Sequence, residues 1–186
     1  MIHVLYLDDE EHNLTAFRAA FRRHFEVHVT TDSAVAERLL DEHPIEVVIS
    51  DQKMPEICGV EFFEMIMANH PDPVRMLLTG HADIDAVIDA INKGRIYKYI
   101  SKPWNEAELK RLVEEASEIY RARKRSQQVS AAYGKNLMSI REALILMRAE
   151  CVEEPLPTQE TRLRWISALD ATIQWIENPD SEFHLP

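Results

Sequence analysis

Polar side chains that could do chemistry stand directly after short apolar runs of the chain. Each run has the length of a buried strand and is followed or closed by a carboxylate, a hydroxyl or an amine: Asp8 and Asp9 after residues 2–7, Asp51 after 46–50, Thr79 closing 74–79, and Lys102 after 96–101. Three carboxylates within about 4 Å would repel one another by roughly 4 kcal/mol per pair at an effective dielectric of 20. A hard divalent cation with oxygen ligands would neutralise them, and Mg²⁺ is the expected one.

These side chains are the parts needed to transfer a phosphoryl group to a carboxylate. One aspartate attacks as the nucleophile, the metal and Lys102 hold phosphoryl oxygens, and the hydroxyl of Thr79 donates to a third oxygen. Such a chain would catalyse its own phosphorylation and dephosphorylation, and not a metabolic reaction. Taken singly, each aspartate is better explained as a loop or turn residue. The joint placement of all five residues at successive strand ends favours the site.

Parallel strands must bring these side chains together. The pattern predicts strands at residues 2–7, 25–30, 46–50, 74–79 and 96–101, with helices between them at about 11–23, 33–42, 59–69 and 83–93. This alternation indicates an α/β fold with a parallel sheet and right-handed crossovers. The carboxyl ends of such strands share one edge of the sheet, which is where functional groups gather.

The last third of the chain has a different pattern. From Asn105, which suits an N-cap, helical residues run to about Glu150. Steps of three and four follow one seam along this helix, and nine of its twelve positions are apolar or aromatic: Leu109, Leu112, Ala116, Ile119, Arg123, Ser126, Ser130, Tyr133, Leu137, Ile140, Leu144 and Met147. The seam predicts a coiled coil with a polar middle. A second, shorter helix would start near Thr158. We expect self-association through the long helix, and an intramolecular helical hairpin packed on the first domain is the alternative.

Charge and composition narrow the classes of partner. The formal net charge of −11 comes from residues 1–120, which hold 12 Lys and Arg against 23 Asp and Glu, because residues 121–186 hold nine of each kind. An acidic domain with a neutral tail is a poor nucleic-acid binder, so no DNA is expected. The sequence has no run apolar enough to cross a membrane and no signal-peptide pattern at its start. Its two cysteines have no metal-ligand spacing, which is typical of free thiols in a cytoplasmic protein.

Four motifs at the predicted strand ends resemble those of bacterial response regulators. "YLDDEE" (6–11) is similar to the acidic pair of that family, "ISDQKMPEICGVEF" (49–62) to its phosphorylation strand and loop, "LLTG" (77–80) to its threonine motif, and "YKYISKPW" (97–104) to its aromatic switch and Lys-Pro motif. The resemblance covers about residues 1–120, as a receiver domain. It implies a flavodoxin-like, doubly wound sheet of five parallel strands in the order 2-1-3-4-5.

The resemblance also implies roles for single residues. Asp51 would take the phosphoryl group from a phosphohistidine of a partner, a histidine kinase or a phosphotransfer protein. Thr79 and Tyr99 would form the switch, and Tyr99 is expected to point toward the surface of the fourth and fifth helices. A Mg²⁺ site would be made of four ligands: Asp8, Asp9, Asp51 and the backbone carbonyl of Lys53. The bond between Lys102 and Pro103 would be cis.

Together these features predict a response regulator of a two-component phosphorelay. Its all-α extension, residues 121–186 with the long helix starting near 105, would form a homodimer whose association is switched by phosphorylation. Two alternatives stay open. One is a pseudo-receiver that serves as a dimer scaffold and is never phosphorylated. The other is the receiver fragment of a longer regulator whose output domain is lost.

Overall fold

The computed structural model describes residues 1–80, 96–153 and 159–177. The chain divides into two compact units, Met1–Arg125 and Ser126–Pro186, which are described separately below. The helix expected at residues 83–93 lies outside the described residues. Among the helices that are described, none combines the length and the apolar character needed to span a membrane.

The first unit is built on a sheet of five parallel strands in the order β2-β1-β3-β4-β5, which confirms the expected topology. The strands are β1 (Ile2–Leu7), β2 (Phe25–Thr30), β3 (Val47–Asp51), β4 (Val74–Thr79) and β5 (Lys98–Ser101). The register places Leu7 beside Ser50, Asp51 beside Leu78 and Thr79 beside Ser101. The carboxyl ends of four strands therefore lie level at one edge of the sheet.

Alternating side chains of the strands bury two apolar clusters, one on each face of the sheet. α1 (Glu11–Phe21) and the first turns of α5 (Glu106–Glu153) cover one face, where Tyr6 and Phe17 are buried. α2 (Ser33–Glu42) and α3 (Gly59–Met67) cover the other face, where Leu5 and Phe63 are buried. A parallel sheet covered on both faces explains why its strands are nearly unbroken apolar runs.

Side-chain caps set the start of two helices. At the start of α2, Asp32 Oδ1 accepts hydrogen bonds from the backbone N–H groups of Ala34 at 2.7 Å and Val35 at 3.1 Å. At the start of α5, Asn105 Oδ1 accepts one from the N–H of Glu108 at 3.0 Å. These bonds satisfy amides for which the helix itself has no acceptor. The caps therefore fix where the loops after β2 and β5 end.

The first turns of α5 belong to the core of the first unit. Leu109, Leu112 and Ala116 are buried against the sheet, in the same cluster as Tyr6 and Phe17. The prediction that a coiled-coil seam begins at Leu109 is therefore wrong for these positions. A buried helix face repeats about every 3.6 residues and a coiled-coil seam about every 3.5, so over a few turns the two patterns look alike.

A buried carboxylate holds α5 at the opposite, amino-terminal end of the strands. Glu46, which precedes β3, accepts hydrogen bonds from Ser117 Oγ at 2.6 Å and from Arg121 Nε at 2.8 Å and Nη2 at 2.9 Å. One turn further along the helix, Lys124 pairs with Asp72. A guanidinium that donates two parallel bonds to one carboxylate is a strong and directional contact. Polar contacts therefore add to apolar packing in fixing this helix to the first unit.

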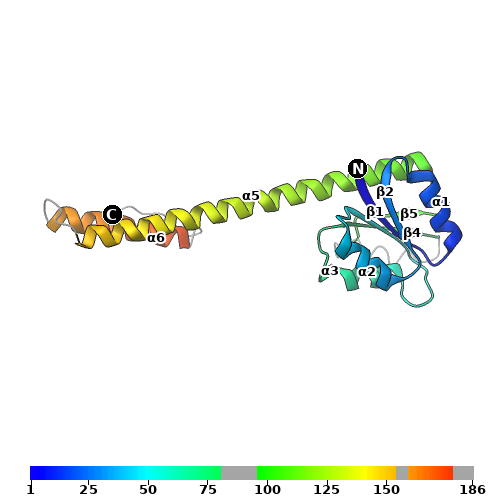
Figure 1. The fold of residues 1–186 in the computed structure, drawn as a ribbon, viewed down its shortest axis with the longest axis horizontal. Helices are drawn as coiled ribbons and strands as arrows, with labels where there is room; N and C mark the ends of the chain where they lie inside the picture. The colour runs from blue at the N-terminus through cyan, green and yellow to red at the C-terminus, as the bar shows by residue number, and fades with distance from the viewer. Residues whose placement is uncertain (81–95, 154–158, 178–186) are drawn as a thin grey trace. The chain divides into compact units, whose positions relative to one another are not determined.

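The second unit is a hairpin of two helices, the later part of α5 and α6 (Gln159–Glu177) (Figure 1). Arg141 of α5 pairs with Glu177 of α6 through Nε at 2.9 Å, and Arg148 pairs with Asp170 through Nε at 2.6 Å. Seven residues forward on α5 thus match seven residues backward on α6, which is an antiparallel register. The two helices of the tail therefore pair within the chain as a hairpin, and the packing of this hairpin on the first domain stays a prediction.

Candidate functional site

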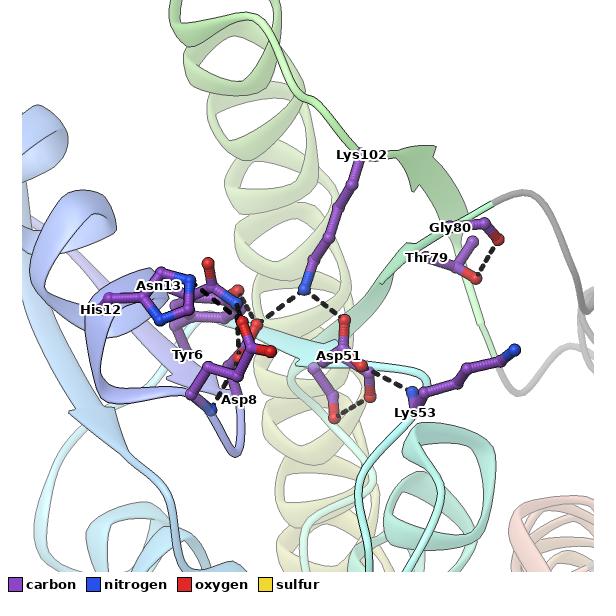
Figure 2. Close-up of polar contacts among 11 residues, drawn as sticks. Tyr6, Asp8, His12, Asn13, Asp51, Lys53, Thr79, Gly80 and Lys102 are labelled. Atoms are coloured by element: carbon purple, nitrogen blue, oxygen red, sulfur yellow. Dashed lines mark hydrogen bonds and ion pairs between the residues drawn. The ribbon is translucent and has the colours of Figure 1, made fainter.

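Asp8 is a fully buried carboxylate at the end of β1, and both of its oxygens have partners. Oδ1 accepts hydrogen bonds from the backbone N–H of Glu10 at 3.0 Å and from Asn13 Nδ2 at 2.9 Å. Oδ2 accepts from the Tyr6 hydroxyl and from Lys102 Nζ at 2.8 Å (Figure 2). Burial opposes ionisation, but the hydrogen bonds from Lys102, Tyr6 and Asn13 outweigh it and lower the pKa of Asp8.

Lys102, which follows β5, bridges the carboxylates at the ends of β1 and β3. Its Nζ contacts Asp8 Oδ2 and also forms an ion pair with Asp51 Oδ1 (Figure 2). The other oxygen of Asp51, Oδ2, accepts a hydrogen bond from the backbone N–H of Lys53 at 2.6 Å. Burial raises the pKa of Asp51, and the contacts with Lys102 only partly offset this rise. For Lys102, burial favours the neutral amine, but its bonds to Asp51 and Asp8 prevail and raise its pKa.

Three other expected residues, Asp9, Thr79 and Tyr99, are not part of this bonded trio. Thr79 Oγ1, at the end of β4, donates to the carbonyl oxygen of Gly80 at 2.8 Å and so points along its own loop (Figure 2). The Asp9 side chain is exposed and makes no polar contact within the described residues. Tyr99 of β5 is 42% exposed and lines, with Trp104 and its neighbours, a groove of about 610 Å³. The sequence thus predicted which strand ends meet, and the structure joins three of the side chains directly.

Two groups that hold Asp8 were not expected from the sequence. Tyr6 looks like a core residue, and its ring packs on Phe17 with the ring centroids 4.5 Å apart. Its hydroxyl reaches Asp8 because residues two apart on a strand point to the same face. Burial and the bond to Asp8 raise the pKa of Tyr6 far above its usual range. Asn13 adds its amide from the first turn of α1. A tyrosine two residues before a strand-end aspartate was the available signal.

The start of α3 packs directly against the backbone of Asp51. A Cβ atom on Gly59 would lie 2.3 Å from the carbonyl oxygen of Asp51 and 2.6 Å from Leu77 Cδ2. The N–H of Gly59 donates to the carbonyl of Gln52 at 3.2 Å. Only glycine permits this close approach, so Gly59 sets the path of the loop between Asp51 and α3.

The donor set at the strand ends suits a hard cation. Asp8, Asp9 and Asp51 offer only oxygen atoms, and the single positive charge of Lys102 is shared by the two carboxylates that it contacts, Asp8 and Asp51. Mg²⁺ is commonly held by one or two carboxylates and keeps several of its waters. Among the described residues, no three His, Cys, Asp or Glu side chains are already arranged around a common metal position. The oxygen donors and the excess of negative charge are the features that fit Mg²⁺.

Comparison with known families identifies the first unit. A model of the response regulator receiver domain matches residues 4–114, which is more than half of the chain. The chain belongs to the response regulator receiver family. Asp8, Asp51 and Lys102 all lie within the matched residues of this receiver domain, whereas α6 and the later part of α5 lie beyond them.

Similar curated proteins are much longer than this chain. The hydrogenase transcriptional regulatory protein HoxA of Bradyrhizobium diazoefficiens is 36% identical over 124 residues, which cover 67% of this chain and 26% of HoxA. A putative NtrX-like response regulator of Rickettsia felis is 32% identical over 121 residues, which cover 63% of this chain and 25% of that protein. The match therefore spans about a quarter of the length of these relatives.

Solved structures resemble the receiver domain over nearly their whole length. An uncharacterized protein from Neptuniibacter caesariensis has a TM-score of 0.62 at 31% identity and aligns over 66% of this chain and 92% of its own. A receiver domain protein from Clostridium thermocellum has a TM-score of 0.62 at 28% identity, over 66% and 98% of the two chains. The beryllofluoride-activated NtrC4 receiver domain dimer has a TM-score of 0.59 at 30% identity, over 64% and 99%.

Proposed function

We propose that this receiver domain accepts a phosphoryl group on Asp51 from the phosphohistidine of a histidine kinase or phosphotransfer protein. One observation carries the proposal most directly. The carboxylate of Asp51 stands at the end of a buried strand and shares the ammonium group of Lys102 with the buried carboxylate of Asp8. A structural ion pair needs only one carboxylate for each lysine. A second acid beside the pair leaves an excess of negative charge that a phosphoryl-transfer site uses for binding a cation.

The contacts of Asp51 suit it as a nucleophile. Its Oδ2 is held by the N–H of Lys53, while Oδ1 lies beside the ammonium group of Lys102. In the transfer, a carboxylate oxygen of Asp51 forms a bond to phosphorus as the phosphorus–nitrogen bond of the phosphohistidine breaks. The electron pair of that bond stays on the imidazole nitrogen of the partner. Lys102 would then hold a phosphoryl oxygen, because its Nζ already lies at the reacting carboxylate.

A Mg²⁺ site is part of the proposal. Its ligands would be Asp8, Asp9, Asp51 and the backbone carbonyl of Lys53. When bound, Mg²⁺ supplies neutralisation of the carboxylates and of the phosphoryl oxygens. Asp8 is the ligand best fixed in place, since four hydrogen bonds orient it. Asp9 would have to turn inward from its exposed position.

The switch would run through Thr79 and Tyr99. The hydroxyl of Thr79 donates a hydrogen bond to the carbonyl oxygen of Gly80. It could give up this bond and donate to a phosphoryl oxygen instead. A phosphoryl group adds about −1.5 to −2 charges and three acceptor oxygens, so it would draw this hydroxyl toward Asp51. Tyr99 could then turn into the space vacated. The groove that it lines also includes Glu108 and Leu112 of α5, so the change would reach that helix.

The proposed output is protein association through the helical extension, with a second copy of the chain as partner and without DNA. The domain boundary near residue 120 and a cytoplasmic location belong to the same proposal.

The length of the curated relatives favours one other candidate function. Because the chain spans about a quarter of them, it could be the receiver portion of a longer regulator with a further output domain.

Mass spectrometry after incubation with a small-molecule phosphodonor and Mg²⁺ tests the acceptor. The wild-type chain should gain one acid-stable, base-labile phosphoryl group, and Asp51→Asn should gain none. Asp41→Asn is the matched control, because Asp41 is an exposed carboxylate on α2 outside the site. Asp9→Ala should also abolish labelling if the Mg²⁺ site is as proposed. Labelling that persists in Asp51→Asn would reject the assignment and favour another acceptor.

A further inference from the structure

Three histidine side chains gather on one face of the sheet, near the amino-terminal end of β1. His3 lies on β1, His28 lies on β2, and His43 directly follows α2. The ring of His28 contacts both of the others, with its centroid 5.7 Å from that of His3 and 4.2 Å from that of His43. All three residues are half-buried, so solvent can reach the cluster. The acidic site does not use these rings, because Asp51 lies at the carboxyl ends of the strands.

The parallel register of β1 and β2 brings His3 and His28 together, although they are 25 positions apart in the chain. His3 lies beside Glu26 and Leu5 lies beside His28, so His3, Glu26 and His28 all point to the face that α2 covers. Two histidines this far apart show no metal-ligand spacing in the sequence. Only the fold reveals that they form a pair.

The two nitrogens that face each other are too far apart for a good hydrogen bond. His28 Nε2 and His3 Nδ1 are 3.5 Å apart while the ring centroids are 5.7 Å apart, so these nitrogens lie on the facing sides of the rings. Hydrogen bonds donated by N–H groups usually span about 2.7–3.2 Å between the heavy atoms. A zinc ion bonds imidazole nitrogen at about 2.0–2.1 Å, so two such nitrogens at a tetrahedral angle are about 3.3–3.4 Å apart. The observed separation is closer to the one that a shared ion needs.

We propose that His3 Nδ1 and His28 Nε2 bind one divalent transition-metal ion, with Zn²⁺ as the test ion. Neutral imidazole is a common ligand of Zn²⁺, Cu²⁺ and Ni²⁺. The two rings supply two ligands and water fills the other positions, since no three His, Cys, Asp or Glu side chains surround a common position within residues 1–80, 96–153 and 159–177. Glu26 adds a carboxylate to the same face of the sheet, beside His3 in the register.

Metal binding fixes where the hydrogen of each ring lies. Both ligating nitrogens must present a lone pair, so the N–H group of His3 is at Nε2 and that of His28 is at Nδ1. In a neutral pair joined by a hydrogen bond, one ligating nitrogen would carry the hydrogen instead. Binding therefore changes the tautomer of one ring and releases no proton. The ring of His43 packs on that of His28 and helps to orient it.

The histidine site is separate from the acidic site and does not depend on the proposed function. His3 and Asp8 are five residues apart along one strand, which is on the order of 16 Å at about 3.3 Å per residue. An ion held by His3 and His28 links β1 to β2, which is an edge strand of the sheet. A ligand that binds only the folded chain stabilises it. Zn²⁺ should therefore raise the midpoint of thermal unfolding of the wild-type chain, and His28→Gln should lose this effect.

Isothermal titration calorimetry of the full chain with zinc chloride tests the site, without a polyhistidine tag and in excess Mg²⁺. The wild-type chain should bind Zn²⁺ that Mg²⁺ does not displace. His3→Gln and His28→Gln should each weaken this binding by about 10-fold or more, because each removes one of the two protein ligands. His24→Gln is the matched control, because His24 is exposed and its ring lies against Phe25, outside the cluster.

The outcomes separate this inference from the proposed function. Asp51→Asn should bind Zn²⁺ as the wild type does, although it should not be phosphorylated. A wild-type chain that binds no Zn²⁺, or undiminished binding in His28→Gln, would overturn the site. Equal losses in His28→Gln and His24→Gln would overturn it too, as would a loss in Asp51→Asn that places the ion at the acidic site.

Long-range proton–nitrogen NMR of the wild-type histidine rings gives a readout that does not depend on how a variant folds. Zn²⁺ should shift the signals of His3 Nδ1 and His28 Nε2 and leave those of His24 in place. The spectrum should also show the N–H of His3 at Nε2 and that of His28 at Nδ1 in the zinc-bound chain. The opposite tautomer of either ring would overturn the assigned ligand atoms.

Discussion

Replacing Lys102 by methionine should expose the electrostatic cost of the acidic site. Methionine keeps an unbranched side chain of similar length and removes the ammonium group that contacts both Asp8 and Asp51. Both carboxylate oxygens lie within 2.8 Å of the same nitrogen, so they are at most about 5.6 Å apart. Two charges at that separation repel by about 3 kcal/mol at an effective dielectric of 20. In the variant no cation would offset this repulsion.

The expected loss of unfolding free energy is about 3 kcal/mol at pH 7. Removing one partner of a buried ion pair typically costs about 3–5 kcal/mol. The lower end of this range applies to Lys102→Met, because the side chain of Lys102 is 28% exposed and water screens part of its attraction to the two carboxylates. Asp8→Asn in the Lys102→Met background should recover more than half of the loss, since it removes the repulsion. Added Mg²⁺ should also stabilise the single variant if the carboxylates bind it.

The pH dependence of this loss has a defined sign. In the wild-type chain the folded pKa of Asp8 is lowered, so its stabilising contribution is present above its unfolded pKa of about 3.9 and disappears as pH falls through the folded value. Without Lys102, the folded carboxylates should take up protons more readily than the unfolded ones. The difference between variant and wild type should therefore shrink as pH falls from 7 toward 4.

Urea unfolding followed by circular dichroism, with hydrogen exchange in peptides from β1 and β3, measures the effect in the receiver domain. Exchange in these strands reports the first unit separately from the hairpin. A loss below about 1 kcal/mol would contradict the reasoning, because it falls under the cost of leaving even one buried charge unpaired. A loss that Asp8→Asn does not reduce would locate the effect in packing and not in the repulsion between Asp8 and Asp51.

Two further substitutions test other polar clusters of the receiver domain. Glu46→Ala should lower the free energy of unfolding by about 2 kcal/mol, because it leaves the buried hydroxyl of Ser117 without its acceptor. Adding Ser117→Ala to this variant should lower it little further. Urea unfolding of the wild type, the two single variants and the double variant measures this coupling. His28 stacks between His3 and His43, and burial, followed by the charges of these two neighbours, lowers its pKa. Folding therefore disfavours protonated His28, so wild-type stability should fall as pH drops from about 7 to about 5.5, and His28→Gln should lose less over the same range.

Much of the site could be predicted because the strands are recognisable in the sequence as short apolar runs. Apolar runs followed at once by Asp8, Asp51 or Lys102 place polar groups at the ends of buried strands, and parallel topology brings those ends to one edge. The contact of Tyr6 with Asp8 was not predictable in the same way, since an aromatic residue on a buried strand normally serves only the core. The hydrogen bond from Thr79 to Gly80 depends on the local path of the loop, and the hydrophobic pattern of the sequence does not predict that path.

The course of α5 shows where periodicity stops being informative. An apolar repeat states that a helix face is covered and does not state by what, so Leu109 and Leu112 gave the same signal as Leu144. The first two pack on a sheet, whereas Leu144 is half-buried on the part of α5 that pairs with α6. Whether a covered face meets a sheet or a second helix depends on packing between segments far apart in the chain, which the spacing of apolar residues along one helix does not record.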